Sequence, residues 1–156
     1  MAKVIVVYES KYGNTKLVAE TIIEGMRKVE GIETVIKELK EVDFNKIANY
    51  DAILIGSPNH FGGPTRSPKK FIDKIGKLPL RGKLFAVFDT YIRGDFEKAV
   101  KKMEKRINEK APELKQITSG LSIKVQGMKG PIVEGELPKC KEFGKKIATQ
   151  LKTSSK

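Results

Sequence analysis

The stretch Val4-Ile5-Val6-Val7-Tyr8, followed by Ser10-Lys11-Tyr12-Gly13-Asn14-Thr15, decides the fold. The first part is apolar at nearly every position, as in a strand that is buried on both faces of a parallel sheet. Leu17 then begins a segment with apolar residues at helical spacing. A strand, a short polar turn and a helix direct backbone N–H groups and the positive end of the helix at one place, which suits a phosphate group.

Length and composition are those of a soluble globular protein. With 156 residues, the chain is expected to form one domain over residues 1–156. No apolar run approaches the roughly 20 residues of a membrane span, and we read no secretory signal in the first residues. Cys140 is the only cysteine, which excludes an internal disulfide and a metal–thiolate cluster. These features predict a protein of the reducing cytoplasm that does not associate with membranes.

The net charge of +12 is unevenly distributed. Residues 1–62 carry 8 Lys and Arg against 9 Asp and Glu, whereas residues 63–156 carry 23 against 10. Most of these basic residues are lysines spread among glutamates, so a solvated surface or an acidic partner protein explains the charge. Nucleic acid is the less favoured partner, because no aromatic-rich basic motif or zinc-finger spacing accompanies the lysines.

Strands and helices alternate along the chain. The predicted strands cover residues 3–8, 32–39, 51–56, 83–88 and 114–125, the last interrupted near Ser119-Gly120. The predicted helices cover residues 15–29, 68–75, 95–110 and 137–151, with a short turn or helix at 43–48 and a frayed tail at 152–156. Ser67 is expected to cap the second helix, and Phe96 to face inward from the third. This alternation predicts a doubly wound α/β sandwich of three layers, with helices on both faces of a five-stranded parallel sheet.

Three loops follow strands directly and therefore project from the same edge of the sheet, where such folds bind ligands: residues 9–15, 56–68 and 89–95. Residues 57–68 are so rich in Gly and Pro that neither helix nor strand is predicted there. The first loop offers the Ser10 and Thr15 hydroxyls, the Asn14 amide and N–H groups freed by Gly13, with Lys11 at its rim. It lacks the Walker and dinucleotide-binding patterns, and an ordinary capped turn is the alternative.

These loops resemble those of the flavodoxins of the short-chain archaeal and bacterial type. Residues 10–15 are similar to the family's phosphate loop, Gly56-Ser57-Pro58…Gly62-Gly63-Pro64 to its second flavin loop, and Phe88-Asp89-Thr90-Tyr91…Gly94 to its third. The resemblance covers essentially the whole chain, including a final helix at 135–151. It implies the flavodoxin-like strand order 2-1-3-4-5 and non-covalently bound FMN. It also implies electron transfer between proteins rather than enzymatic catalysis.

The resemblance places the FMN phosphate on the first loop and the isoalloxazine ring between the other two. The implied FMN-binding residues are Ser10, Lys11, Tyr12, Gly13, Asn14, Thr15, Ser57, Pro58, Asn59, His60, Phe61, Gly62, Gly63, Asp89, Thr90, Tyr91, Arg93 and Gly94. Tyr91, or else Phe61, is expected to stack on the flavin. Asp89 either contacts the flavin or caps a turn. His60 lies either at the flavin edge or exposed on the loop. Gly62 or Gly63 would let a peptide turn over beside the flavin.

The chain departs from the family in its charge, because flavodoxins are commonly acidic. Acidic redox partners are therefore expected, such as a ferredoxin, a rubredoxin or a reductase. An FMN-dependent NAD(P)H:quinone oxidoreductase is the alternative function, and a flavin-free scaffold or nucleic-acid-binding protein is the second alternative. A phosphoacceptor receiver domain is excluded because the third strand ends in Gly56-Ser57-Pro58 instead of an aspartate.

Overall fold

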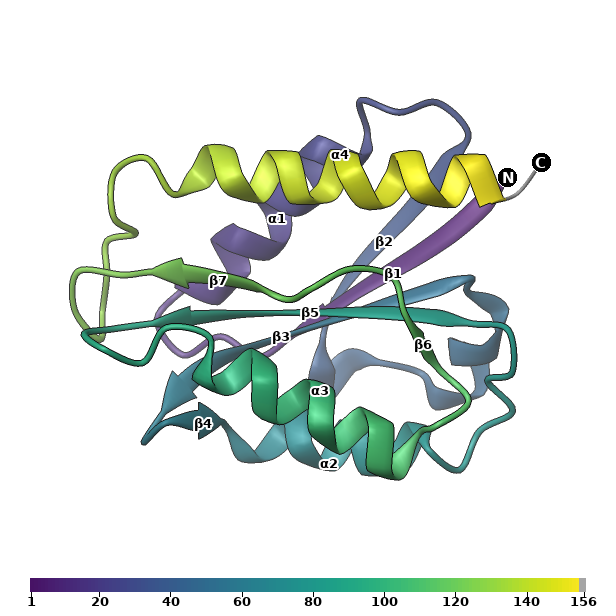
Figure 1. Cartoon of the computed structure of the whole chain (residues 1–156), viewed down its shortest axis with the longest axis horizontal. Helices are drawn as coiled ribbons and strands as arrows, with labels where there is room; N and C mark the ends of the chain where they lie inside the picture. Colours follow the sequence, from purple (N-terminus) through teal and green to yellow (C-terminus); the bar gives the residue numbers. More distant parts are fainter. Residues whose placement is uncertain (155–156) are drawn as a thin grey trace.

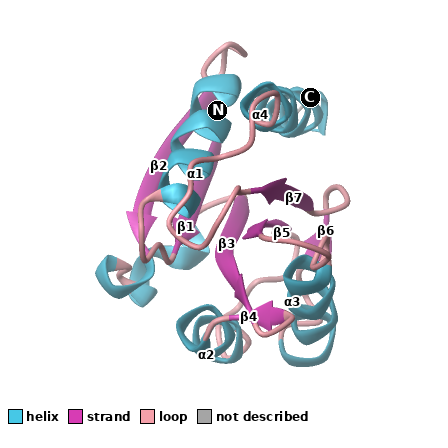
Figure 2. Ribbon diagram, turned by 90° about the vertical axis from the view of Figure 1, so that its left-hand side faces the viewer, coloured by secondary structure: helices cyan, strands magenta, loops and turns pink. Residues whose placement is uncertain are grey.

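The computed structural model describes residues 1–154 and has three layers (Figure 1). A sheet lies between α1 (Asn14–Met26) and α4 (Leu137–Ser154) on one face, and α2 (Arg66–Ile75) and α3 (Lys98–Lys110) on the other. Figure 2, turned by 90°, shows the two helical pairs on opposite sides of the sheet. No helix within residues 1–154 is long and apolar enough to cross a membrane.

The predicted order of the parallel strands is confirmed. β2 (Ile32–Glu38), β1 (Ala2–Tyr8), β3 (Ala52–His60) and β5 (Leu84–Tyr91) lie side by side. The fifth position is shared by β6 (Lys115–Gln116) and β7 (Leu121–Lys124), which pair with opposite ends of β5. The break between them falls at the predicted Ser119-Gly120 interruption. Two 3₁₀ helices, η1 (Leu39–Glu41) and η2 (Phe44–Asn49), connect β2 to β3 and include the predicted turn.

The buried strands supply both halves of the core. In β1, Val4 and Val6 face α1 and α4, whereas Ile5 and Val7 face α2 and α3. This alternation fixes the pairing register, because a slip by one residue would exchange the side chains of the two faces. The sheet therefore holds the carboxyl ends of β1, β3 and β5 at one edge.

The second loop is more regular than predicted. β3 continues to His60, because Ser57 and Pro58 still pair with Asp89 and Thr90 of a longer β5. The chain then reverses through Phe61 and Gly62, which both have positive φ (52° and 77°). β4 (Gly63–Pro64) returns antiparallel to β3. The expectation that residues 57–68 contain no strand is therefore wrong, since pairing overrides the local Gly and Pro content.

Several predicted helix ends are also wrong. α1 ends at Met26, although Val29 still packs on the core. α2 begins at Arg66 after Thr65, so Ser67 is not its N-cap. α3 begins only at Lys98, because Glu97 before it has a left-handed backbone, and Phe96 is exposed instead of facing inward.

The end of the chain also differs from its prediction. α4 runs through Ser154, so residues 152–154 of the predicted tail are helical, and residues 155–156 lie outside the described part.

Candidate cofactor-binding site

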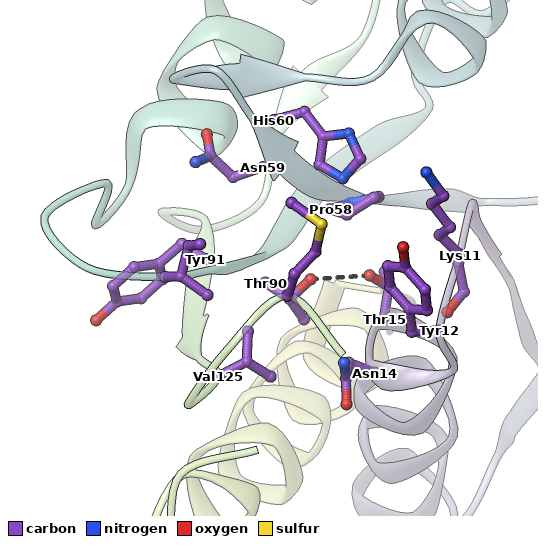
Figure 3. Close-up of a pocket in the computed structure, with 13 residues that line it drawn as sticks. Lys11, Tyr12, Asn14, Thr15, Pro58, Asn59, His60, Thr90, Tyr91 and Val125 are labelled. Atoms are coloured by element: carbon purple, nitrogen blue, oxygen red, sulfur yellow. Dashed lines mark hydrogen bonds between the residues drawn. The ribbon is translucent and has the colours of Figure 1, made fainter. Parts of the chain in front are cut away.

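The carboxyl ends of β1, β3 and β5 meet in a crevice with an empty volume of about 420 Å³, open mouth included (Figure 3). Its lining contains many of the residues that the sequence predicts: Ser10, Lys11, Tyr12, Asn14, Thr15, Pro58, Asn59, His60, Thr90 and Tyr91. Three loops far apart in sequence thus converge on one place, as their positions after parallel strands require.

The first loop leaves the start of α1 open to an anion. Gly13 is left-handed (φ 94°), and its N–H donates to the Ser10 hydroxyl oxygen at 3.0 Å. Within residues 1–154, no side chain caps α1 and its first turn holds no acidic residue. The first N–H groups of a helix lack partners within the helix and lie at its positive end. Here they border the crevice.

A buried hydrogen bond joins the first loop to the third. The Thr15 and Thr90 hydroxyl oxygens are 2.9 Å apart, and Figure 3 shows this bond on the floor of the crevice. Both side chains are at least 95% buried. A hydroxyl retains further hydrogen-bonding capacity after one such bond. The pair therefore fixes the spacing of two loops and still offers polar groups to a ligand.

Asn59 has an unsatisfied carbonyl beside the crevice. Its Nδ2 donates to Asp95 Oδ2 at 2.7 Å, whereas its Oδ1 is the one buried side-chain polar atom in residues 1–154 that has no hydrogen-bond partner. An unsatisfied buried acceptor costs about 1–3 kcal/mol. Hydrogen bonds from Lys98 and then Asn59 lower the pKa of Asp95, so its carboxylate stays ionised and holds the Asn59 amide. A ligand N–H donor would satisfy the remaining oxygen.

Of the two aromatic candidates, only Tyr91 lines the crevice. Its ring packs edge-on against Phe96 (centroids 5.5 Å apart), and Figure 3 shows it at one end of the crevice, extending away from Thr15. Burial, and secondarily Glu136, raises the pKa of the Tyr91 hydroxyl. Phe61 is fully exposed at the hairpin tip and lies outside the lining. His60 also lines the crevice.

Asp89 and Ser57 are buried outside the lining and hold the scaffold together. The Asp89 carboxylate accepts hydrogen bonds from the Val100 N–H (3.0 Å) and the Ser122 hydroxyl (2.6 Å), so it ties β5 to α3 and β7. Burial raises the pKa of Asp89 to about 7, against the opposing effect of these hydrogen bonds. The Ser57 hydroxyl accepts from the Thr65 N–H at 3.0 Å. Asp89 therefore bonds to the first turn of α3 and to β7, which differs from both expectations: it neither lines the crevice nor bonds within the turn that follows it.

The remaining candidates do not line the crevice. They are Gly13 in the first loop, Gly62 and Gly63 in the hairpin, and Arg93 and Gly94 after β5. Conversely, the lining includes Ile92, Val125 and Met128, which the sequence did not single out. Val125 and Met128 follow β7, the last parallel strand. Segments that follow parallel strands lie at the same edge of the sheet, and this rule predicted the other three loops. Applied to the segment after β7, it would also have identified Val125 and Met128.

Two lysines approach the first loop. Lys11 Nζ lies 5.6 Å from the centroid of the Tyr12 ring, and Lys129 Nζ lies 5.9 Å from the same centroid. Neither lysine has a carboxylate partner within residues 1–154. Both positive charges are therefore available to an anion near the start of α1.

The flavodoxin domain model matches residues 5–123, so the chain belongs to this family. The family's cofactor is FMN and its activity is electron transfer, which confirms the expected cofactor.

Solved structures agree with the family. Flavodoxin 2 from Bacillus cereus is similar with a TM-score of 0.80 at 28% identity, over 96% of this chain and 99% of that one. A flavodoxin from the domain Archaea is similar with a TM-score of 0.79 at 26% sequence identity, over 96% of this chain and 99% of that one. The rubredoxin oxygen:oxidoreductase of Desulfovibrio gigas shares the fold, with a TM-score of 0.79 at 20% identity, over 98% of this chain and 37% of that one.

Proposed function

We propose that this chain is an FMN-dependent electron carrier of the cytoplasm that exchanges electrons with acidic redox proteins. The observation that carries the proposal is the pairing of an uncapped α1 start with the unsatisfied Asn59 oxygen at one crevice. An anionic group and an N–H donor on one ligand would satisfy both. FMN has a phosphate at one end and an imide N–H in its ring, so the residues present fit this cofactor.

Residues 10–15 hold the phosphate in this proposal. The N–H groups at the start of α1 and the Ser10 and Thr15 hydroxyls provide hydrogen bonds, as at other helix N-termini that bind phosphate. Lys11 and Lys129 add positive charge from outside the hydrogen-bonding shell. Neither lysine forms an ion pair within residues 1–154, so the phosphate does not compete with a carboxylate for them.

Asn59, Tyr91 and Pro58 form the ring end of the site in this proposal. Asn59 accepts a hydrogen bond from the ring, and the Asp95 carboxylate keeps its amide oriented. Tyr91, Pro58 and Val125 give the crevice apolar surface that excludes water. FMN, when bound, supplies the redox chemistry, because the flavin ring takes up and releases electrons.

The partner's docking surface is proposed around the β3–β4 hairpin. Phe61 is fully exposed at its tip. A Cβ built on Gly62 would lie 3.7 Å from Lys98 Cδ, and one on Gly63 would lie 3.3 Å from Lys102 Cδ, so both lysines flank the hairpin. An aromatic residue between cations favours a partner surface that is acidic around an apolar centre.

Titration of the apoprotein with FMN tests the cofactor site. We expect one FMN per chain, and Asn59→Ala should weaken FMN binding about tenfold, the loss of one buried hydrogen bond. Asn45→Ala, a substitution on the distant η2, is the matched control. Absence of FMN binding, or equal affinity of wild type and Asn59→Ala, would overturn the assignment of this crevice.

Electron transfer from the reduced protein to an acidic ferredoxin tests the partner. Lys102→Glu should slow the reaction at low salt, whereas Lys146→Glu on α4 should not, because α4 lies in the opposite helical layer. Lys98 stays unchanged in this test, because its ion pair with Asp95 supports Asn59 at the cofactor crevice. Rates that change neither with salt nor with Lys102→Glu would contradict an acidic partner. Consumption of NADH in the presence of a quinone would instead favour the oxidoreductase alternative.

A further inference from the structure

A second and larger hollow lies on the other side of the first loop. This α2 groove is defined by Tyr8, Glu38, Phe44, Lys70, Phe71 and Lys74 and has an empty volume of about 1020 Å³, open mouth included, against about 420 Å³ for the cofactor crevice. It lies between the carboxyl ends of β1 and β2 and the first turns of α2. The two hollows share only Ser10, so FMN in the crevice leaves the α2 groove open.

The walls of the α2 groove are aromatic. The Phe44 and Phe71 rings pack with their centroids 5.4 Å apart, and Lys74 Nζ lies 3.9 Å from the centroid of Phe44. Tyr8, from β1, also lines it. Aromatic faces at such an opening favour a flat apolar ligand, because stacked and edge-on rings gain energy beyond area burial.

The free charge of the α2 groove is positive. Both carboxylates in its lining already have partners: Glu38 pairs with Lys40 Nζ at 3.3 Å, and Glu9 accepts a hydrogen bond from the Thr65 hydroxyl. Neither Lys70 nor Lys74 has a carboxylate partner within residues 1–154, and Lys74 Nζ lies over the Phe44 ring. Two ammonium groups on successive turns of α2 are thus left without a counter-charge.

We propose that the α2 groove is a second ligand site, which binds a small planar aromatic compound carrying one anionic group. The ring of the ligand packs against Phe44 and Phe71, and its anionic group lies at Lys70 and Lys74. The site does not depend on FMN, since the cofactor crevice is separate.

The experiment uses the full chain loaded with FMN and titrated with 2-naphthoate, with backbone amide NMR shifts as the readout. We expect saturable shifts at Phe44, Lys70 and Lys74 but not at Asn59 or Thr90. Lys70→Glu should weaken binding at least about tenfold. Lys69→Glu, the same charge change on the same helix but outside the lining, should change it less than about twofold.

A neutral analogue, 2-naphthalenemethanol, tests the anionic requirement and should bind at least about tenfold more weakly. Shifts confined to the cofactor crevice, equal binding of the neutral analogue, or equal loss in both lysine variants would each overturn the proposal. Absence of saturable shifts would do so as well. Repetition without FMN separates this result from the cofactor assignment, because the α2 groove should bind 2-naphthoate either way.

Discussion

The two helical layers are held to the sheet in different ways. Between α1 and α4, the backbones meet at glycines: a Cβ on Gly25 would lie 2.1 Å from the Lys141 carbonyl oxygen, and one on Gly144 would lie 2.0 Å from that of Ile22. The layer of α2 and α3 has one such approach, at Gly76 beyond the end of α2, and it adds polar links to its apolar core. Arg106 donates two hydrogen bonds to Asp73, at 2.8 and 2.7 Å, and Asp89 holds the start of α3.

Both layers pack on the sheet through apolar side chains, and the layer of α2 and α3 adds groups that titrate or respond to salt. Between α1 and α4, the described residues form one ion pair, Lys141 with Glu24 at 3.6 Å, and both of these side chains are at least half exposed. Changes of pH and ionic strength should therefore act mainly on α2 and α3.

Asp89 should give the largest effect. Its folded-state pKa of about 7 lies above the ordinary 3.8, so the protonated carboxyl is favoured in the fold. The stability from this group is fully present below about pH 4 and is lost as the pH rises through 7, which amounts to about 4 kcal/mol. Asp89→Asn should remove this dependence and be more stable than wild type at about pH 8, by urea denaturation.

Hydrogen exchange locates the Asp89 effect. The amides of the first turn of α3 should exchange faster in wild type at high pH than in Asp89→Asn, with exchange in α1 and α4 unchanged once it is corrected for the intrinsic pH dependence. If the free energy of unfolding changes with pH in the same way for wild type and Asp89→Asn across this range, the role given to Asp89 is refuted.

Gly144→Ala should destabilise the fold by about 3 kcal/mol, independently of pH. The new methyl group would overlap the backbone of α1, which cannot move aside as a flexible side chain would. In a helix, alanine is otherwise more stabilising than glycine by about 1 kcal/mol. Any loss of stability in Gly144→Ala would therefore come from crowding. Lys145→Ala, at the neighbouring exposed position, is the control for urea denaturation. A stabilised Gly144→Ala would show that the two helices are not in this close contact.

The Arg106–Asp73 pair should contribute about 1 kcal/mol, because both side chains are more than a third exposed. The Arg106 hydrogen bond lowers the pKa of Asp73, so this stability is present above the ordinary pKa and is lost as the pH falls, opposite in sign to Asp89. A double-mutant cycle with Arg106→Ala and Asp73→Asn measures the coupling. We expect this coupling free energy to decrease at about 1 M salt. A coupling free energy that does not change with salt would contradict an exposed ion pair that salt can screen.

The smallest effect should come from Lys129, which carries charge without packing. Lys129→Gln should weaken FMN binding about two- to fivefold at low salt, about 0.5–1 kcal/mol, and leave urea stability unchanged. Riboflavin lacks the phosphate, so its affinity should not change. Lys152→Gln on α4 is the matched charge control. Equal losses for FMN and riboflavin would show that Lys129 does not act on the phosphate.

Sequence patterns predicted what depends on local spacing. The strand order, the shared edge of three loops and most of the crevice lining follow from apolar runs and from the residues after them. The hairpin at Phe61 was missed because the end of β3 depends on pairing with β5, which no local pattern reports. The late start of α3 was missed because the Ser122 hydroxyl accepts from the Glu97 N–H at 2.9 Å, a contact between residues 25 positions apart.

The position of Cys140 has a consequence for electron transfer. The only thiol of the chain is fully buried beside α1, and burial raises its pKa to about 12. At neutral pH, roughly one molecule in 100,000 would carry the thiolate, the form that reacts with oxidants and disulfides. The chain therefore exposes no thiol that could react with oxidants in place of the cofactor. Electrons that enter the molecule are therefore held by the cofactor. Two copies of the chain do not form an intermolecular disulfide under oxidising conditions.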